Sequence, residues 1–263
     1  MASSTPIGAA HRRPWHARLR EALHAGAFEI HYQPIVSLRD RRVAHYEALV
    51  RLADDRRGGL VAPGRFLEAA ERYGLIVDID RLVLGRVIAL LAEGFAGGPG
   101  RDGACVAVNL SALSVTDERT LGHIESELAR NRVEPSRLIL EITETAAITD
   151  MDQARRFCEC VQGLGCAVAL DDFGAGYGSF HYLKHLPFSY LKIDGEFIRG
   201  LPGSRTDQLV VEAIAGIVRG MGRRTIAEFV GDEDTLTMLA GYGVDYAQGF
   251  AIGRPRPVLA LAA

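Results

Sequence analysis

Five short segments with the composition of β-strands each end in an acidic or amide side chain. The carboxyl ends of the strands in a parallel α/β barrel converge on one face, so side chains at those ends gather into a single polar site. Glu47, near the end of an earlier strand-like run, adds a further carboxylate. The sequence therefore predicts a barrel with a cluster of oxygen ligands at its mouth. The five segments span residues 106–109, 138–141, 168–172, 225–228 and 246–248.

Carboxylates that meet in a barrel mouth repel one another. At an effective dielectric constant of about 20, two such charges a few Å apart repel by several kcal/mol, so a cluster of them must bind protons or cations. The predicted cluster is rich in oxygen and free of histidine, which favours Mg²⁺ or Mn²⁺ over Zn²⁺. We therefore expect a hard divalent cation at this end of the barrel.

Strand-like runs alternate with helical patterns along the chain. About eight such runs occur, the number that a closed α/β barrel needs, and the length of 263 residues suits one domain of this kind. Residues 37–42 join the first two runs and are too few for a parallel crossover. The predicted fold class is therefore α/β, a modified TIM (β/α)8 barrel with an antiparallel first strand hairpin. The strand-like runs span residues 28–36, 43–52, 104–110, 137–142, 167–172, 190–194, 224–228 and 244–248, and the helical patterns span 63–73, 78–92, 116–131, 150–163, 206–221 and 232–240.

Charge and hydropathy argue against several classes of partner. The net charge of −3 gives no reason to expect a DNA or RNA polymer. No stretch of 18 apolar residues occurs, so we expect no membrane span, and the N-terminus lacks the apolar core of a signal peptide. The four cysteines, Cys105, Cys158, Cys160 and Cys166, lack the spacing of a zinc site and should be reduced thiols, which suits a cytoplasmic protein.

Eight short motifs follow one another along the chain: Tyr32-Gln33-Pro34-Ile35, Glu47-Ala48-Leu49-Val50-Arg51, Asn109-Leu110-Ser111, Glu141-Ile142-Thr143-Glu144, Asp171-Asp172-Phe173-Gly174-Ala175-Gly176-Tyr177, Lys192-Ile193-Asp194, Ala227-Glu228 and Gln248-Gly249-Phe250. Their order resembles that of the EAL family of cyclic di-GMP phosphodiesterases. The resemblance covers roughly residues 20–257, which leaves residues 1–19 and 258–263 as tails, with a short helix expected at about 14–24. A single Glu-Ala-Leu string would carry no weight, whereas this many motifs in order make coincidence negligible.

The resemblance implies a hydrolase that cuts one phosphodiester of cyclic di-GMP to give linear pGpG. It assigns two divalent cations, Mg²⁺ or Mn²⁺, to the mouth of a modified barrel. Two cations that share one carboxylate and one hydroxide lower the pKa of the attacking water and stabilise both reacting oxygens. By motif position the first cation takes Glu47, Asn109, Glu141 and Asp171, and the second takes Asp171, Asp172 and Glu228.

Four motif residues, three of them also cation ligands, form the catalytic set that the resemblance implies. Lys192 resembles the family lysine that contacts the attacking water and the phosphate, where its charge would stabilise developing negative charge. Glu228 matches a residue with the role of general base, and that role competes with metal binding because a metal-bound carboxylate is a poor base. Glu47 and Asp171 complete the set. Asp194, at the end of the run that contains Lys192, is expected to cap a helix.

Three polar residues resemble family contacts to the substrate. Gln248 would line the pocket and Arg51 would grip a phosphate, while Gln33 would touch a guanine edge. Hydrogen bonding at the barrel mouth explains Gln33 and Arg51 equally well. In the family the loop after Asp172 connects the metal site to a dimer contact, so a homodimer through this loop is a further expectation, and a short helix should follow it. Glu144 resembles the glutamate that holds the loop, and an ordinary acid at a helix start is the alternative.

The chain departs from the family pattern directly after Glu228. The family usually continues Gly-Val-Glu, whereas this chain reads Phe229-Val230-Gly231. Losing the second glutamate would lower the rate or misplace Glu228 without abolishing metal binding. An active phosphodiesterase is the main hypothesis. A degenerate EAL domain that binds cyclic di-GMP or a protein partner without hydrolysis is the alternative, and no residue excludes hydrolysis of another cyclic or linear dinucleotide.

Overall fold

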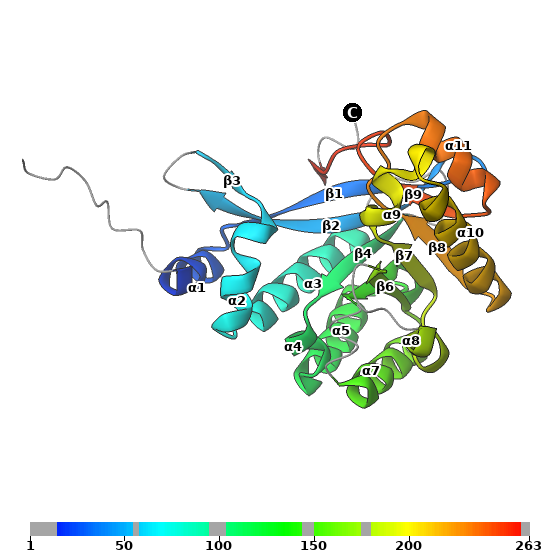
Figure 1. Ribbon diagram of the computed structural model, residues 1–263. Coiled ribbons are helices and arrows are strands. Elements are labelled where there is room, and N and C mark those ends of the chain that lie inside the picture. The colour runs from blue at the N-terminus through cyan, green and yellow to red at the C-terminus, as the bar shows by residue number, and fades with distance from the viewer. Residues whose placement is uncertain (1–14, 55–57, 95–103, 144–149, 175–179, 259–263) are drawn as a thin grey trace, which may run out of the picture.

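Eight strands of the computed structural model close into a barrel, with helices packed around the outside (Figure 1). The structure describes residues 15–54, 58–94, 104–143, 150–174 and 180–258. Around the barrel the strands follow the order β1, β9, β8, β7, β6, β5, β4 and β2, and β2 pairs again with β1. The predicted α/β barrel is therefore confirmed. The strands are β1 (Phe28–Ser37), β2 (Val43–Asp54), β4 (Cys105–Leu110), β5 (Leu138–Thr143), β6 (Ala167–Phe173), β7 (Tyr190–Ile193), β8 (Arg224–Ala227) and β9 (Tyr246–Gln248), with the short β3 (Gly59–Val61) and β10 (Arg256–Pro257) beside them.

The first strand runs against the direction of the others. β1 is antiparallel to both of its barrel neighbours, β2 and β9, whereas the remaining barrel pairs are parallel. The predicted antiparallel hairpin is thus confirmed, and its register pairs Phe28 with Leu52 and Gln33 with Glu47. Because β1 is reversed, its first residues lie at the end of the barrel where the parallel strands finish. That end is the barrel mouth.

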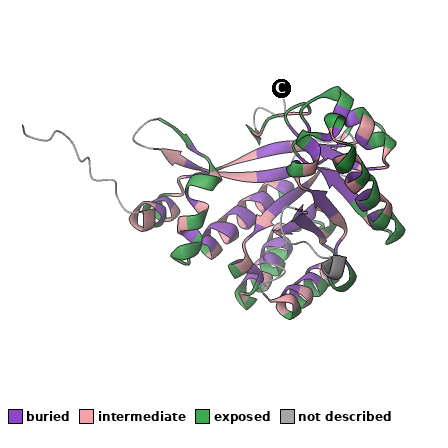
Figure 2. Cartoon of the chain, in the orientation of Figure 1, coloured by how far each residue is buried: buried purple, intermediate pink, exposed green. Residues whose placement is uncertain are grey.

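The barrel strands are apolar on both faces because helices cover them from outside. All residues of β5 are buried except the last, Thr143, which is half-buried. Figure 2 shows the buried residues gathered on the strands and on the inner faces of the helices. The helices are α1 (Trp15–Ala25), α2 (Leu67–Arg72), α3 (Ile76–Ala92), α4 (Ala112–Val115), α5 (Glu118–Asn131), α7 (Met151–Gly163), α8 (Phe180–His185), α9 (Gly195–Arg199), α10 (Arg205–Gly220) and α11 (Glu233–Gly241), with 3-10 turns at Pro63–Arg65, Pro135–Arg137 and Leu201–Gly203.

The differences from the sequence-based prediction lie in short elements. The helix expected at 63–73 divides into a 3-10 turn and α2, because Phe66 between them has a φ of −133°. The strands β3 and β10 and the helix α4 were not predicted, since two to four residues are too few to show a periodic pattern. The short helix expected after the Asp172 loop is present as α8. Within the described ranges, no helix is both long and apolar enough to cross a membrane.

An aromatic cluster around His45 closes the end of the barrel opposite the mouth. His45 lies on β2 and is 6% exposed, with its ring centroid 5.2 Å from that of Tyr190 and 4.9 Å from that of Tyr246. No group in the described part of the chain hydrogen-bonds to either of its ring nitrogens. Burial, and then the charge of Arg224, lowers the pKa of His45 to about 4. The folded barrel therefore holds a neutral imidazole at this end.

We expect His45 to make the protein less stable in acid. Its pKa falls from 6.5 to about 4 on folding, so the unfolded chain takes up the proton first, and the stabilisation that is complete above pH 6.5 is lost as the pH falls toward 4. A shift of this size is worth about 3 kcal/mol. Urea unfolding at about pH 7.5 and about pH 4.5 should show a smaller loss in His45→Leu than in the wild type.

Other groups also titrate between about pH 7.5 and about pH 4.5. The quantity to compare is therefore the loss of unfolding free energy in each variant relative to that in the wild type. The exposed His24 provides the matched control, and His24→Gln should keep the wild-type pH dependence. Equal losses of stability in His45→Leu and the wild type would contradict the assignment.

Candidate active site at the barrel mouth

Lys192 occupies the centre of the polar cluster at the barrel mouth. It lies on β7 and is 1% exposed. Its Nζ is 2.8 Å from Glu141, 3.0 Å from Glu228, 3.1 Å from Asp171 and 3.7 Å from Glu47. These carboxylates come from β5, from the residue that follows β8, from β6 and from β2. One buried ammonium therefore draws together the mouth ends of five strands.

Three amide side chains form a chain of hydrogen bonds with Glu47. Asn109 donates to one of its carboxylate oxygens at 2.7 Å, and Gln248 donates to the other at 2.5 Å. Gln248 also donates to Gln33 at 3.1 Å, and Gln33 donates to the carbonyl of Gly253 at 3.0 Å. These contacts hold both oxygens of Glu47 in place. Gln33 thus braces the mouth, while its contact with a substrate stays a prediction.

The cluster carries more negative than positive charge. Burial raises the pKa of Glu228 to about 8, although the nearby Lys192 opposes this effect. Burial, followed by the charge of Asp171, raises the pKa of Asp172 to about 6. Burial also raises the pKa of Glu141 well above its ordinary value. Full ionisation of these carboxylates therefore requires positive charge beyond that of Lys192.

Asp171, Asp172 and Glu228 form a compact set of oxygen donors. Each offers a carboxylate oxygen, and these atoms lie within 4.8 Å of one another. Consecutive strand residues normally point to opposite faces, but Asp172 has a φ of 56° and its N–H donates to the carboxylate of Asp171 at 2.9 Å. This turn brings both aspartates to the same site. The structure thus brings together the three ligands predicted for the second cation, and their chemistry suits Mg²⁺ or Mn²⁺.

The residues predicted for the first cation are arranged differently. Glu47, Glu141 and Asp171 surround the Lys192 ammonium, and Asn109 donates to Glu47. One oxygen of Glu141 is buried and accepts no hydrogen bond from any described group. Such an acceptor fits a cation, because buried polar atoms in proteins are usually satisfied.

Two predicted site residues are not joined to this cluster by a described contact. Arg51 lies on β2, is half-buried, and donates to the carbonyl of Val50 at 2.9 Å. Burial lowers the pKa of Arg51, while the charge of Glu47 acts in the opposite direction. Its role toward a phosphate stays a prediction. Glu144 and residues 175–179 of the loop after Asp172 lie outside the described residues.

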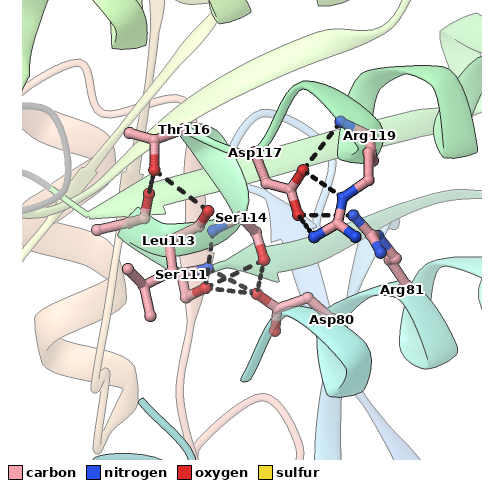
Figure 3. A network of polar contacts seen from close by, with 9 residues as sticks. Asp80, Arg81, Ser111, Leu113, Ser114, Thr116, Asp117 and Arg119 are labelled. Atoms are coloured by element: carbon pink, nitrogen blue, oxygen red, sulfur yellow. Dashed lines mark hydrogen bonds and ion pairs between the residues drawn. The ribbon is translucent and has the colours of Figure 1, made fainter. Parts of the chain in front are cut away.

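Asp80 supports the mouth although the sequence did not suggest it. It lies on α3 and is 7% exposed. Its Oδ2 accepts hydrogen bonds from the N–H and Oγ of Ser111 at 3.0 and 2.8 Å and from the Oγ of Ser114 at 2.6 Å (Figure 3). Ser111 caps α4 and stands two residues after Asn109. Asp80 therefore fixes the turn that follows Asn109. The signal that could have revealed it is an acid on the buried face of an otherwise apolar helix.

Comparison with known proteins places this barrel in one family. A family model described as the EAL domain matches residues 16–255. The chain belongs to the EAL domain family. The resemblance carried by the sequence motifs is thereby confirmed.

Named relatives of this EAL domain are several times longer than the chain. The bifunctional diguanylate cyclase/cyclic di-GMP phosphodiesterase MucR of Pseudomonas aeruginosa is 38% identical over 239 residues, which are 91% of this chain and 34% of MucR. The cyclic di-GMP phosphodiesterase PdeF of Escherichia coli is 35% identical over 242 residues, which are 92% of this chain and 32% of PdeF. The chain thus spans about a third of the length of these curated relatives.

Solved EAL structures superpose closely on the barrel. The PaMucR phosphodiesterase in complex with c-di-GMP matches with a TM-score of 0.87 and 37% identity, over 94% of this chain and 99% of that one. The EAL domain of Xanthomonas citri FimX in complex with c-di-GMP matches with a TM-score of 0.83 and 32% identity, over 92% and 93% of the two chains. The EAL fold therefore extends over nearly the whole of this chain.

Replacing Asp80 with alanine should destabilise the protein. The change would leave the buried hydroxyl of Ser114 and the half-buried donors of Ser111 without their acceptor, at an expected loss of about 2–3 kcal/mol in the free energy of unfolding. Asp80→Asn keeps an oxygen acceptor in place and should lose less. Urea unfolding of both variants measures the difference. Glu125→Ala removes an exposed acid from α5 and serves as the control. Equal unfolding midpoints for Asp80→Ala and Glu125→Ala would show that the network contributes nothing.

Proposed function

We propose that this EAL domain is a metal-dependent phosphodiesterase that hydrolyses cyclic di-GMP to linear pGpG. The observation that carries the proposal is the convergence of carboxylates on the buried ammonium of Lys192 at the mouth of the barrel. Relatives named as cyclic di-GMP phosphodiesterases, and similar structures described as complexes with c-di-GMP, support cyclic di-GMP as the substrate.

Two divalent cations, Mg²⁺ or Mn²⁺, belong to the proposed site. Cations bound there would lower the pKa of a water molecule and stabilise the attacking and leaving oxygens. Asn109 would bind through its carbonyl oxygen, because its amide nitrogen donates to Glu47. The proposed ligands are Glu47, Asn109, Glu141 and Asp171 for one cation, and Asp171, Asp172 and Glu228 for the other.

The chain's own residues supply charge and position. Lys192 is held by three carboxylates at 2.8 to 3.1 Å, so its ammonium has a fixed place beside the proposed reaction centre. A fixed positive charge stabilises negative charge that develops on a phosphate. Glu228 lies close enough to Asp171 and Asp172 to act as a ligand. Its other proposed role, as general base, competes with that one. Glu228, Lys192, Glu47 and Asp171 form the proposed catalytic set.

Three residues complete the proposed substrate site. Gln248 and Gln33 form a buried amide pair beside Glu47, and their polar groups would orient the substrate at the mouth. Arg51 comes from β2, beyond Glu47, and its guanidinium would grip a phosphate. Phosphate suits this side chain because the planar guanidinium can donate two parallel hydrogen bonds.

The organisation of the chain is part of the same proposal. We assign residues 20–257 to the EAL domain, with tails at 1–19 and 258–263. We also propose a homodimer through the loop after Asp172, with Glu144 as the residue that holds this loop. A cytoplasmic location suits the thiols of Cys105, Cys158, Cys160 and Cys166, which are all free.

Incubation with cyclic di-GMP tests the proposal directly. Chromatography should show pGpG when Mg²⁺ or Mn²⁺ is present, and none with Ca²⁺ or after chelation. Glu47→Ala and Asp171→Ala each remove a proposed ligand oxygen, so both should lose nearly all turnover. If either variant keeps more than about a few per cent of the wild-type rate, the ligand assignment is wrong.

The second candidate function is that of a receptor, and the departure at Phe229 and Gly231 favours it. Binding alone does not separate the two functions, because both use the same pocket. Intact cyclic di-GMP in the presence of Mg²⁺ or Mn²⁺, together with measurable binding, would establish the receptor. If the protein hydrolyses a different dinucleotide and leaves cyclic di-GMP intact, that dinucleotide becomes the assigned substrate.

Restoring glutamate at position 231 tests whether its absence from this chain affects catalysis. A side chain added at Gly231 meets open space, so Gly231→Glu should fold normally. We expect its turnover to rise and its affinity for cyclic di-GMP to stay similar, because the new carboxylate would help to position Glu228. Steady-state kinetics and equilibrium binding measure the two quantities. Gly241→Ala, at another open position, is the control, and an unchanged rate in Gly231→Glu would show that the departure is harmless.

A further inference from the structure

Helix α9 contacts the two chain segments that directly follow Asp172–Phe173 and Glu228. The ring of Phe197, on α9, packs against Gly174 so closely that a Cβ atom at Gly174 would overlap it. The ring of Phe229 packs in the same way against Gly195, the first residue of α9. Two contacts between an aromatic ring and a glycine therefore connect the loop after β6, α9 and the loop after β8.

The backbone of Phe229 adopts an unusual conformation directly after Glu228. Its φ is 54°, in the left-handed region that residues other than glycine rarely occupy. The residue is 54% exposed, so burial in the core does not hold its side chain. The ring instead lies against Gly195, with the guanidinium of Arg199 4.0 Å from the ring centroid. Contacts with α9 therefore hold the ring of a residue whose backbone is strained.

The backbone on either side of Phe229 is fixed to the neighbouring strands. The N–H of Glu228 donates to the carbonyl of Ile193 at 3.2 Å, and the N–H of Val230 donates to the carbonyl of Gln248 at 3.0 Å. Phe229 is the residue between these two attachments, so its torsion angles set how the chain turns after Glu228.

We propose that Phe229 is a positioning residue, whose ring, packed between Gly195 and Arg199, directs Glu228 into the barrel mouth. The inference rests on the proposed function, because it takes Glu228 as a cation ligand. Where the family pattern has glycine, this chain holds the left-handed turn through side-chain packing. The residue that the sequence marks as the main departure from the family thus supports the site.

Gly195→Ala is the sharpest test, because its Cβ would displace the Phe229 ring without changing any proposed ligand. Phe229→Ala removes the ring and leaves the left-handed backbone without its support. Each variant should weaken Mn²⁺ binding, measured by titration calorimetry, by about tenfold, as expected when a partner that orients a ligand is lost. The double variant, Gly195→Ala with Phe229→Ala, should bind Mn²⁺ about as weakly as Phe229→Ala alone, because the ring that Gly195→Ala displaces is then absent. Gly203→Ala, at an open position close to α9, should bind as the wild type does.

Hydrolysis of cyclic di-GMP provides a second measurement on the same proteins. Both single variants should lower kcat more than they change KM, since Glu228 acts on the reacting group rather than on substrate affinity. If the wild type hydrolyses nothing, the proposed function fails, while the Mn²⁺ titrations still decide the positioning role.

Three results would overturn the inference. Gly195→Ala could match Gly203→Ala in Mn²⁺ affinity, or the losses of affinity in the single variants could multiply in the double variant. Thermal unfolding identifies the third case, in which Gly195→Ala fails to fold, the double variant folds, and Phe229→Ala binds Mn²⁺ as tightly as the wild type. The contact would then stabilise the fold without directing Glu228.

Discussion

The ammonium of Lys192 allows several carboxylates to share the barrel mouth. Burial of a charge is unfavourable unless it is paired, and removal of one partner from a buried pair leaves the other uncompensated. Lys192 contacts Glu141, Glu228 and Asp171 at 2.8 to 3.1 Å, so each of these side chains depends on the same positive charge. The amide chain around Glu47 and the network around Asp80 act on the periphery of this centre. The site is therefore a single electrostatic unit.

Much of this arrangement could be predicted from the sequence. Acids and amides at the ends of strand-like runs indicated a parallel barrel, because the ends of parallel strands meet on one face. The short segment before Val43 required an antiparallel hairpin. These inferences depend on local periodicity and on chain length, which a sequence displays directly. Glu47, Asp171 and Gln248 accordingly lie at the mouth.

The remaining features depend on contacts between distant segments. Asp80 meets Ser111 only because α3 packs beside the end of β4, and Phe229 meets Gly195 only because β7 and β8 are neighbours. The sequence shows an acid in a helix and an aromatic residue in a loop, and it does not specify what they contact. The same limit applies to His45, whose neighbours come from β7 and β9. The place of a residue in the fold was thus easier to predict than the residues that it contacts.

The reversed direction of β1 also determines at which end of the barrel α1 joins it. Helix α1 precedes β1, and β1 starts where Phe28 pairs with Leu52, further along β2 than Glu47 (Figure 1). In a barrel of regular parallel strands the first strand would begin at the opposite end. A polypeptide joined ahead of α1 would therefore be tethered on the entrance side of the barrel, next to the site and not behind the core.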